Sequence, residues 1–171
     1  MKTRIAALSV LLLFFISTAS SQEKSKKEMK EEQKLEKQMA VEAMVNAKEF
    51  TFVGRMANPS GMRSVNLATN PNYMKFSQGL VESEMPYFGT SRTPVYGGDA
   101  GLKFKGKPEE FTMEKGKKNY EGMIVVKGDD DKYKIYLTIG FDGNATLSVS
   151  CNNRSNISYT GEISGMEITP R

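Results

Sequence analysis

Two groups of acidic residues have types and spacings that could do chemistry. Glu82 and Glu84 are two positions apart, so in a strand their side chains would share one face, about 7 Å apart. Carboxylate pairs in glycoside hydrolases have separations in this range. The other group is Asp129, Asp130 and Asp131, whose oxygens could bind Ca²⁺. Because three consecutive side chains diverge and no EF-hand spacing follows, we interpret this run as a solvated turn, with a metal site as the weak alternative.

The composition excludes several mechanisms. The 171 residues include no histidine and one cysteine, Cys151, which excludes Ser-His-Asp triads, Cys-His dyads and His-ligated zinc. A single cysteine also excludes an intrachain disulfide. Cys151 alternates with Leu147 and Val149, so we expect a buried, inert thiol. We predict neither a cofactor nor a catalytic residue.

The N-terminus has the pattern of an export signal. A basic start is followed by the apolar run Ile5–Ile16 and the small residues Ser17–Ser21, a pattern typical of a secretory signal peptide. The run is too short for a membrane span. We expect cleavage near Ser21 and a periplasmic or extracellular protein without a transmembrane segment. Removing Lys2 and Arg4 from the 24 basic residues leaves 22 against 20 acidic ones, which gives no electrostatic footprint for nucleic acid.

The chain after the signal is predicted to contain a helix before a single β-rich domain. Residues 22–34 are dense in Lys and Glu and predict a charged linker or frayed helix. The domain is expected over residues 35–171 and begins with a helix. Its apolar stripe, which could bury itself against the strands that follow, comprises Leu35, Met39, Ala40, Ala43, Met44 and Ala47.

Beyond Lys48, apolar residues recur at every second position, as in β-strands. Alternation is clearest over residues 120–127, 133–139, 145–151 and 157–163, with short connections and an Asp142-Gly143 hairpin turn. This pattern predicts a C-terminal antiparallel meander. The fold class is therefore mainly β (α+β): a twisted antiparallel sheet, a curled barrel or a sandwich, preceded by one N-terminal helix. The pattern does not choose among the three.

Two segments hold the candidate ligand-binding residues. Tyr87 and Phe88, between Pro86 and Gly89, could line an apolar or glycan-binding cleft, or could plug the core at a corner. Arg154 near Tyr159 could hold a carboxylate or phosphate, or could tie down a loop. Arg92 is a weaker candidate in a loop.

These segments carry a family resemblance. Phe50-Thr51-Phe52, Met85-Pro86-Tyr87-Phe88-Gly89, Gly143–Leu147 and Asn153–Gly161 occur in this order. The series resembles an exported bacterial family typical of Bacteroidota, domain of unknown function 4251, over roughly residues 35–164. The resemblance implies a secreted, β-rich domain and transfers no reaction, cofactor or catalytic residue.

Three classes of function fit the sequence. The first is a non-catalytic envelope binding module for a small apolar ligand, a glycan or a protein. The second is a structural or accessory envelope protein that acts through its N-terminal helix. The third is a His-free enzyme that uses carboxylates. An enclosed apolar cavity near Tyr87 and Phe88 would favour the first class. A solid core with the Leu35–Ala47 stripe exposed would favour the second, and a pocket with converging carboxylates the third.

Overall fold

A computed structural model describes residues 26–69, 72–92 and 101–166; the predicted export signal, residues 1–21, lies outside them. The chain divides into two compact units, Met1–Gln33 and Lys34–Arg171. Helix α2 (Lys26–Ala47) begins in the first unit. Across the described ranges, no helix is both long and apolar enough to span a membrane.

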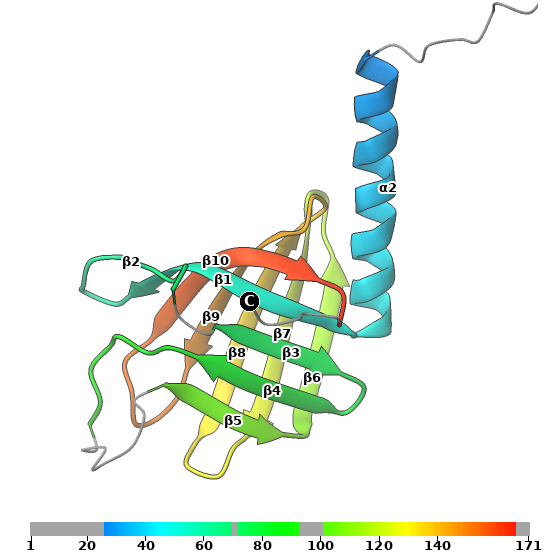
Figure 1. Cartoon of the computed structure of the whole chain (residues 1–171). Coiled ribbons are helices and arrows are strands. Elements are labelled where there is room, and N and C mark those ends of the chain that lie inside the picture. Colours follow the sequence, from blue (N-terminus) through cyan, green and yellow to red (C-terminus); the bar gives the residue numbers. More distant parts are fainter. Residues whose placement is uncertain (1–25, 70–71, 93–100, 167–171) are drawn as a thin grey trace, which may run out of the picture. The chain divides into compact units, whose positions relative to one another are not determined.

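The described residues of the second unit contain one antiparallel sheet of ten strands. The strands follow the order β5-β4-β3-β1-β10-β9-β8-β7-β6, with the short β2 paired to β1, and curl into a nearly closed barrel (Figure 1). This arrangement confirms the predicted mainly β class with one helix before the sheet. The strands are β1 (Phe50–Pro59), β2 (Val65–Asn66), β3 (Tyr73–Ser77), β4 (Leu80–Met85), β5 (Leu102–Gly106), β6 (Pro108–Lys115), β7 (Asn119–Lys127), β8 (Lys132–Gly140), β9 (Asn144–Ser150) and β10 (Ile157–Ser164).

The predicted alternation places the core on the inner face of the sheet. In β8, Tyr133, Ile135 and Leu137 are buried, whereas the residues between them are exposed. The Asp142-Gly143 turn joins β8 to β9 and pairs Ile139 with Ala145. Gly143 has a φ of 84°, a left-handed conformation that glycine adopts without a steric penalty. The predicted meander is therefore confirmed as β7–β10.

The prediction for the buried stripe of the helix is wrong. The buried residues of α2 are Val41 and Val45, whereas Leu35 and Met39 are 59% and 63% exposed. Ala40, Ala43 and Ala47 are also exposed, and only Met44 of the predicted stripe is partly buried. The predicted stripe depended largely on alanines, which bury little apolar area. The two valines at four-residue spacing offer more, and they join the core of the second unit.

Local contacts fix the end of α2 against the barrel. Lys48 adopts a φ of 55°; the Lys48 amide donates to the Val45 carbonyl and the Glu49 amide to the Met44 carbonyl, both at 3.1 Å. These bonds form a Schellman cap. The Lys48 ammonium donates to the Phe111 carbonyl of β6 at 3.1 Å, and Lys115 forms an ion pair with Glu42. The last turns of the helix are therefore held by β6 as well as by the core.

Candidate functional site

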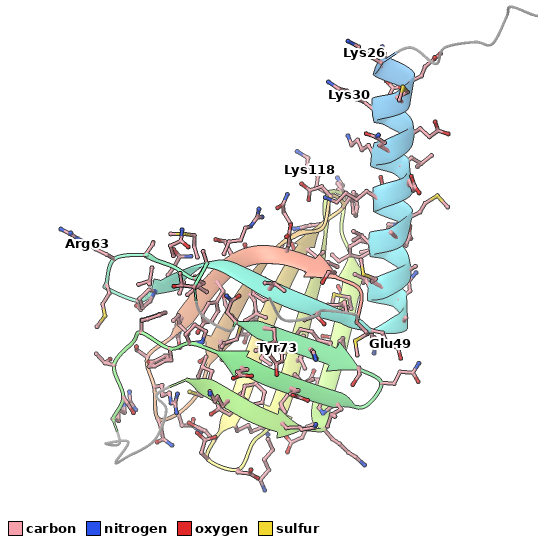
Figure 2. The ribbon with its side chains drawn as sticks, viewed as in Figure 1. Lys26, Lys30, Glu49, Arg63, Tyr73 and Lys118 are labelled. Atoms are coloured by element: carbon pink, nitrogen blue, oxygen red, sulfur yellow. The ribbon has the colours of Figure 1, made fainter. Side chains whose placement is uncertain are left out.

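The carboxylates Glu82 and Glu84 lie on β4 and are both ion-paired. Lys105 Nζ lies 3.0 Å from Glu82 Oε2, and Lys103 Nζ lies 3.4 Å from Glu84 Oε1. The hydrogen bond from Lys105 lowers the pKa of Glu82 against the opposing effect of partial burial. Tyr73, labelled in Figure 2, donates to Glu82 Oε1 at 3.4 Å. A carboxyl group with a lowered pKa stays ionised at neutral pH, so Glu82 is unsuited to be the proton donor of a glycosidase pair.

The segment after β4 contacts the loop before β10. The Tyr87 hydroxyl lies 2.8 Å from the Thr90 carbonyl, 3.0 Å from the Ser155 carbonyl and 2.9 Å from Ser155 Oγ. The Ser155 amide donates to the Thr90 carbonyl at 2.9 Å, and the Thr90 amide donates to Ser155 Oγ at 3.0 Å. We call this contact, formed by Tyr87, Thr90, Arg154, Ser155 and Tyr159, the Tyr87 corner.

Arg154 and Tyr159 belong to the same corner. The Arg154 guanidinium donates to the Gly101 carbonyl at 2.8 Å and lies 5.3 Å from the centre of the Tyr87 ring. Its side chain is only 11% exposed. Tyr159 is fully buried and donates to the Pro86 carbonyl at 2.8 Å, and burial raises its pKa. The structure thus brings together three of the predicted ligand-binding residues, and the contacts they make lie within the chain.

Gly89 is required by the close approach within this corner. A Cβ atom at position 89 would collide with the Tyr87 hydroxyl and Ser155 Oγ. The glycine therefore lets the backbone pass directly beside the Tyr87–Ser155 hydrogen bond.

The remaining two predicted residues lie beside the corner. Phe88 is partly buried and packs against the hydrophobic core. Arg92 is exposed, and its backbone amide donates to the Asn153 carbonyl at 2.8 Å. The loop that holds Arg92 is thereby fixed to the β9–β10 connection by main-chain atoms.

The three aspartates form the turn between β7 and β8. Asp131 accepts hydrogen bonds from the Lys132 amide at 2.7 Å, the Asn153 amide at 2.9 Å and Asn152 Nδ2 at 3.0 Å. Partial burial opposes its ionisation, but these donors outweigh burial and lower the pKa of Asp131. Both oxygens of Asp130 accept from the Tyr133 hydroxyl, at 2.8 and 2.9 Å.

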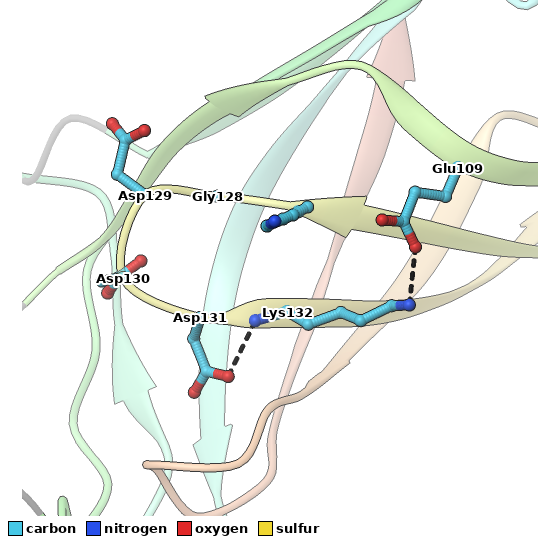
Figure 3. Close-up of a pocket in the computed structure, with 7 residues that line it drawn as sticks. Glu109, Gly128, Asp129, Asp130, Asp131 and Lys132 are labelled. Atoms are coloured by element: carbon cyan, nitrogen blue, oxygen red, sulfur yellow. Dashed lines mark hydrogen bonds and ion pairs between the residues drawn. The ribbon is translucent and has the colours of Figure 1, made fainter.

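A surface pocket of about 400 Å³ lies at this turn, between it and Glu109. Figure 3 shows the three carboxylates pointing in different directions, with Lys132 bonded to Glu109 at 2.6 Å. Among the described residues, no group of three or more acidic or cysteine side chains could hold a metal ion together. Two of the three aspartates, Asp130 and Asp131, accept hydrogen bonds within the chain.

Cys151 differs from the prediction in its burial. It directly follows β9 and is only partly buried. Desolvation, followed by the charge of Asp131, raises the pKa of its thiol, so the thiol is mostly protonated at neutral pH and a weak nucleophile.

The side of α2 turned away from the core carries three residues of the stripe predicted from the sequence, Leu35, Met39 and Ala43, which are exposed rather than buried. We define the Leu35 face as Leu35, Glu36, Met39 and Ala43, all exposed. Leu35, Met39 and Ala43 succeed each other at four-residue spacing, so they lie along one side of the helix. The sequence signal for this orientation is the pair Val41 and Val45, because burial of the two valines leaves Leu35 and Met39 in contact with solvent.

The fold defines a class of protein, a nearly closed antiparallel barrel preceded by one helix. The sequence profile described as "Domain of unknown function (DUF4251)" matches residues 31–163. The chain therefore belongs to the DUF4251 family.

A similar fold occurs among the solved structures. One example is a DUF4251 family protein from Bacteroides eggerthii DSM 20697, with 18% identity and a TM-score of 0.60. The match covers 75% of this chain and 87% of that one. No curated protein matches the chain.

Proposed function

We propose that this protein is an exported, non-catalytic interaction module whose barrel holds α2 so that the Leu35 face binds a protein partner. The observation that carries the proposal is the exposure of Leu35 and Met39 on a helix that buries only Val41 and Val45. Large apolar side chains in contact with water at neighbouring positions are typical of protein-binding helices. The export signal expected in residues 1–21 supports an envelope or extracellular location.

The internal contacts of the other candidates also support this choice. The side chains of Tyr87, Arg154 and Tyr159 donate hydrogen bonds to main-chain carbonyl groups of the same chain. Glu82 and Glu84 are paired with lysines. The binding-module and enzyme hypotheses both depended on these side chains, whereas the helix hypothesis depends on residues that face solvent.

The test compares two variants in the producing bacterium. Leu35→Gln combined with Met39→Gln removes the apolar surface and keeps good helix formers. Met62→Gln is the matched control, because Met62 is 52% exposed in the loop after β1. In-cell crosslinking followed by affinity purification should recover a defined partner with the control and lose it with the double variant. Recovery of the same partner at the same yield from both would refute the proposal.

A further inference from the structure

We infer that the partner of the Leu35 face is a basic amphipathic helix, with apolar residues at helical spacing flanked by Lys or Arg. This inference rests on the proposed function and concerns the chemistry of the partner. It is carried by the way in which charge is distributed around α2.

Within the second unit, acidic and basic residues lie on different sides of the helix. Glu36 lies about 20° from Ala43 around the helix axis, on the Leu35 face. Lys34 and Lys37 lie within about 40° of Val41, on the side that joins the core. Met39 and Ala43 are thus next to Glu36 and away from both lysines, whereas Leu35 lies about 100° from both Glu36 and Lys34.

The start of α2, in the first unit, also has its acidic and basic residues on different sides of the helix. By helical geometry, Lys26, Lys27 and Lys30 fall within an arc of about 100° around the helix axis. The three glutamates of this stretch fall within a second arc of about 100° on a different side. In Figure 2, Lys26 and Lys30 extend from the same side of the helix. The acidic residues of this stretch are Glu28, Glu31 and Glu32.

This charge pattern argues against two other occupants. A second copy meeting the Leu35 face symmetrically would bring one Glu36 near the other, and like charges at an interface disfavour binding. An anionic bilayer would repel the same carboxylate, whereas peripheral helices place Lys or Arg beside the apolar residues that insert. In a basic amphipathic helix, the apolar side chains can pack on Leu35 and Met39, and the flanking Lys or Arg can pair with the Glu36 carboxylate.

The probe is a synthetic helical peptide of Leu, Ala and Lys, with Leu at positions i, i+3, i+4 and i+7. The control peptide carries Glu in place of every Lys. Fluorescence anisotropy with the protein lacking its signal should give at least about tenfold tighter binding for the Lys peptide, decreasing with added salt. Equal binding of the two peptides, or binding of neither, would overturn the inference.

Matched charge variants place the binding on the helix. Glu36→Lys should weaken binding of the Lys peptide about fivefold. Lys34→Glu, about 140° from Met39 around the helix axis, should change it less than about twofold. Circular dichroism checks that both variants keep the helix. Equal effects of the two substitutions would overturn the inference, as would dimerisation that depends on Leu35 or binding to anionic phosphatidylglycerol vesicles without peptide binding.

These outcomes separate the inference from the proposed function. If the Leu35→Gln/Met39→Gln variant loses its cellular partner but the Lys peptide does not bind, only the partner's chemistry is wrong. If the double variant keeps that partner, the proposed function fails.

Discussion

The side-chain oxygens of Tyr87 and Ser155 lie 2.9 Å apart although the two residues are separated by 68 positions in the sequence. This contact joins the segment that follows β4 to the loop between β9 and β10. Both segments lie within the region that matches the family. The two most distinctive sequence segments of the chain therefore meet in one structural corner.

Removing the Tyr87 hydroxyl should destabilise the protein. Tyr87→Phe keeps the ring beside Arg154 but leaves the hydrogen-bonding groups of Ser155 and Thr90 without this partner, at a cost of about 1–2 kcal/mol. Thermal unfolding should show a decrease in Tm of a few degrees, about 2–4 °C per kcal/mol for a domain of this size. Tyr136→Phe is the control, because Tyr136 is 49% exposed. Equal Tm values for the two variants would show that the corner contributes no stability.

Arg154 should be required for stability rather than for anion binding. Arg154→Met keeps much of the side-chain volume but removes the donors to the Gly101 carbonyl, with an expected loss of about 1–3 kcal/mol. Urea unfolding measures this loss. Adding phosphate or acetate to the wild-type protein should leave its unfolding midpoint unchanged. A midpoint that rises with anion in the wild type but not in Arg154→Met would instead identify an anion site.

Asp131 should make stability depend on pH on the acid side. Its pKa is lowered in the folded state, so its contribution is present above the unfolded value of 3.8 and is lost as the pH falls through the folded value. Asp131→Asn should therefore destabilise the protein at pH 7 and approach the wild type in strong acid. Urea unfolding across this pH range measures the difference. Asp129→Asn, in the exposed part of the same turn, is the control, and a difference between Asp131→Asn and wild type that is the same at every pH would contradict the assignment.

The two sides of α2 should respond differently to truncation. Val41→Ala or Val45→Ala removes buried methyl groups and should cost about 1–3 kcal/mol. Leu35→Ala and Met39→Ala should each change the free energy of unfolding by less than about 0.5 kcal/mol. Chemical denaturation of the four variants tests the pattern. A large loss of stability on truncating Leu35 would mean that this side of the helix is covered by the chain itself.

Residue periodicity predicted the strands well because each strand buries alternate side chains. The alternation of Tyr133, Ile135 and Leu137 in β8 agrees with the burial observed. Periodicity could not distinguish a barrel from a sandwich, since that choice depends on how the ends of the sheet approach each other. It also misplaced the buried side of α2, because the predicted stripe included three alanines and left out Val41 and Val45.

The contacts of the Tyr87 corner could not be derived from the sequence. The sequence predicts Tyr87, Arg154 and Tyr159 as candidate ligand-binding residues, but no local pattern relates positions so far apart. The role of Asp131 was hidden for the same reason, since its partners Asn152 and Asn153 belong to a different loop. Side-chain types were enough to select candidate residues, but the partners of each residue follow only from the tertiary structure.

Hydroxyl-radical footprinting of the methionines tests the central claim most directly. Met39 and Met62 are 63% and 52% exposed, so both should oxidise readily in the purified protein. In intact producing cells, a partner bound to the Leu35 face should protect Met39 while Met62 stays reactive. Oxidation of Met39 in cells at the same rate, relative to Met62, as in the purified protein would contradict the proposal that this face binds a partner.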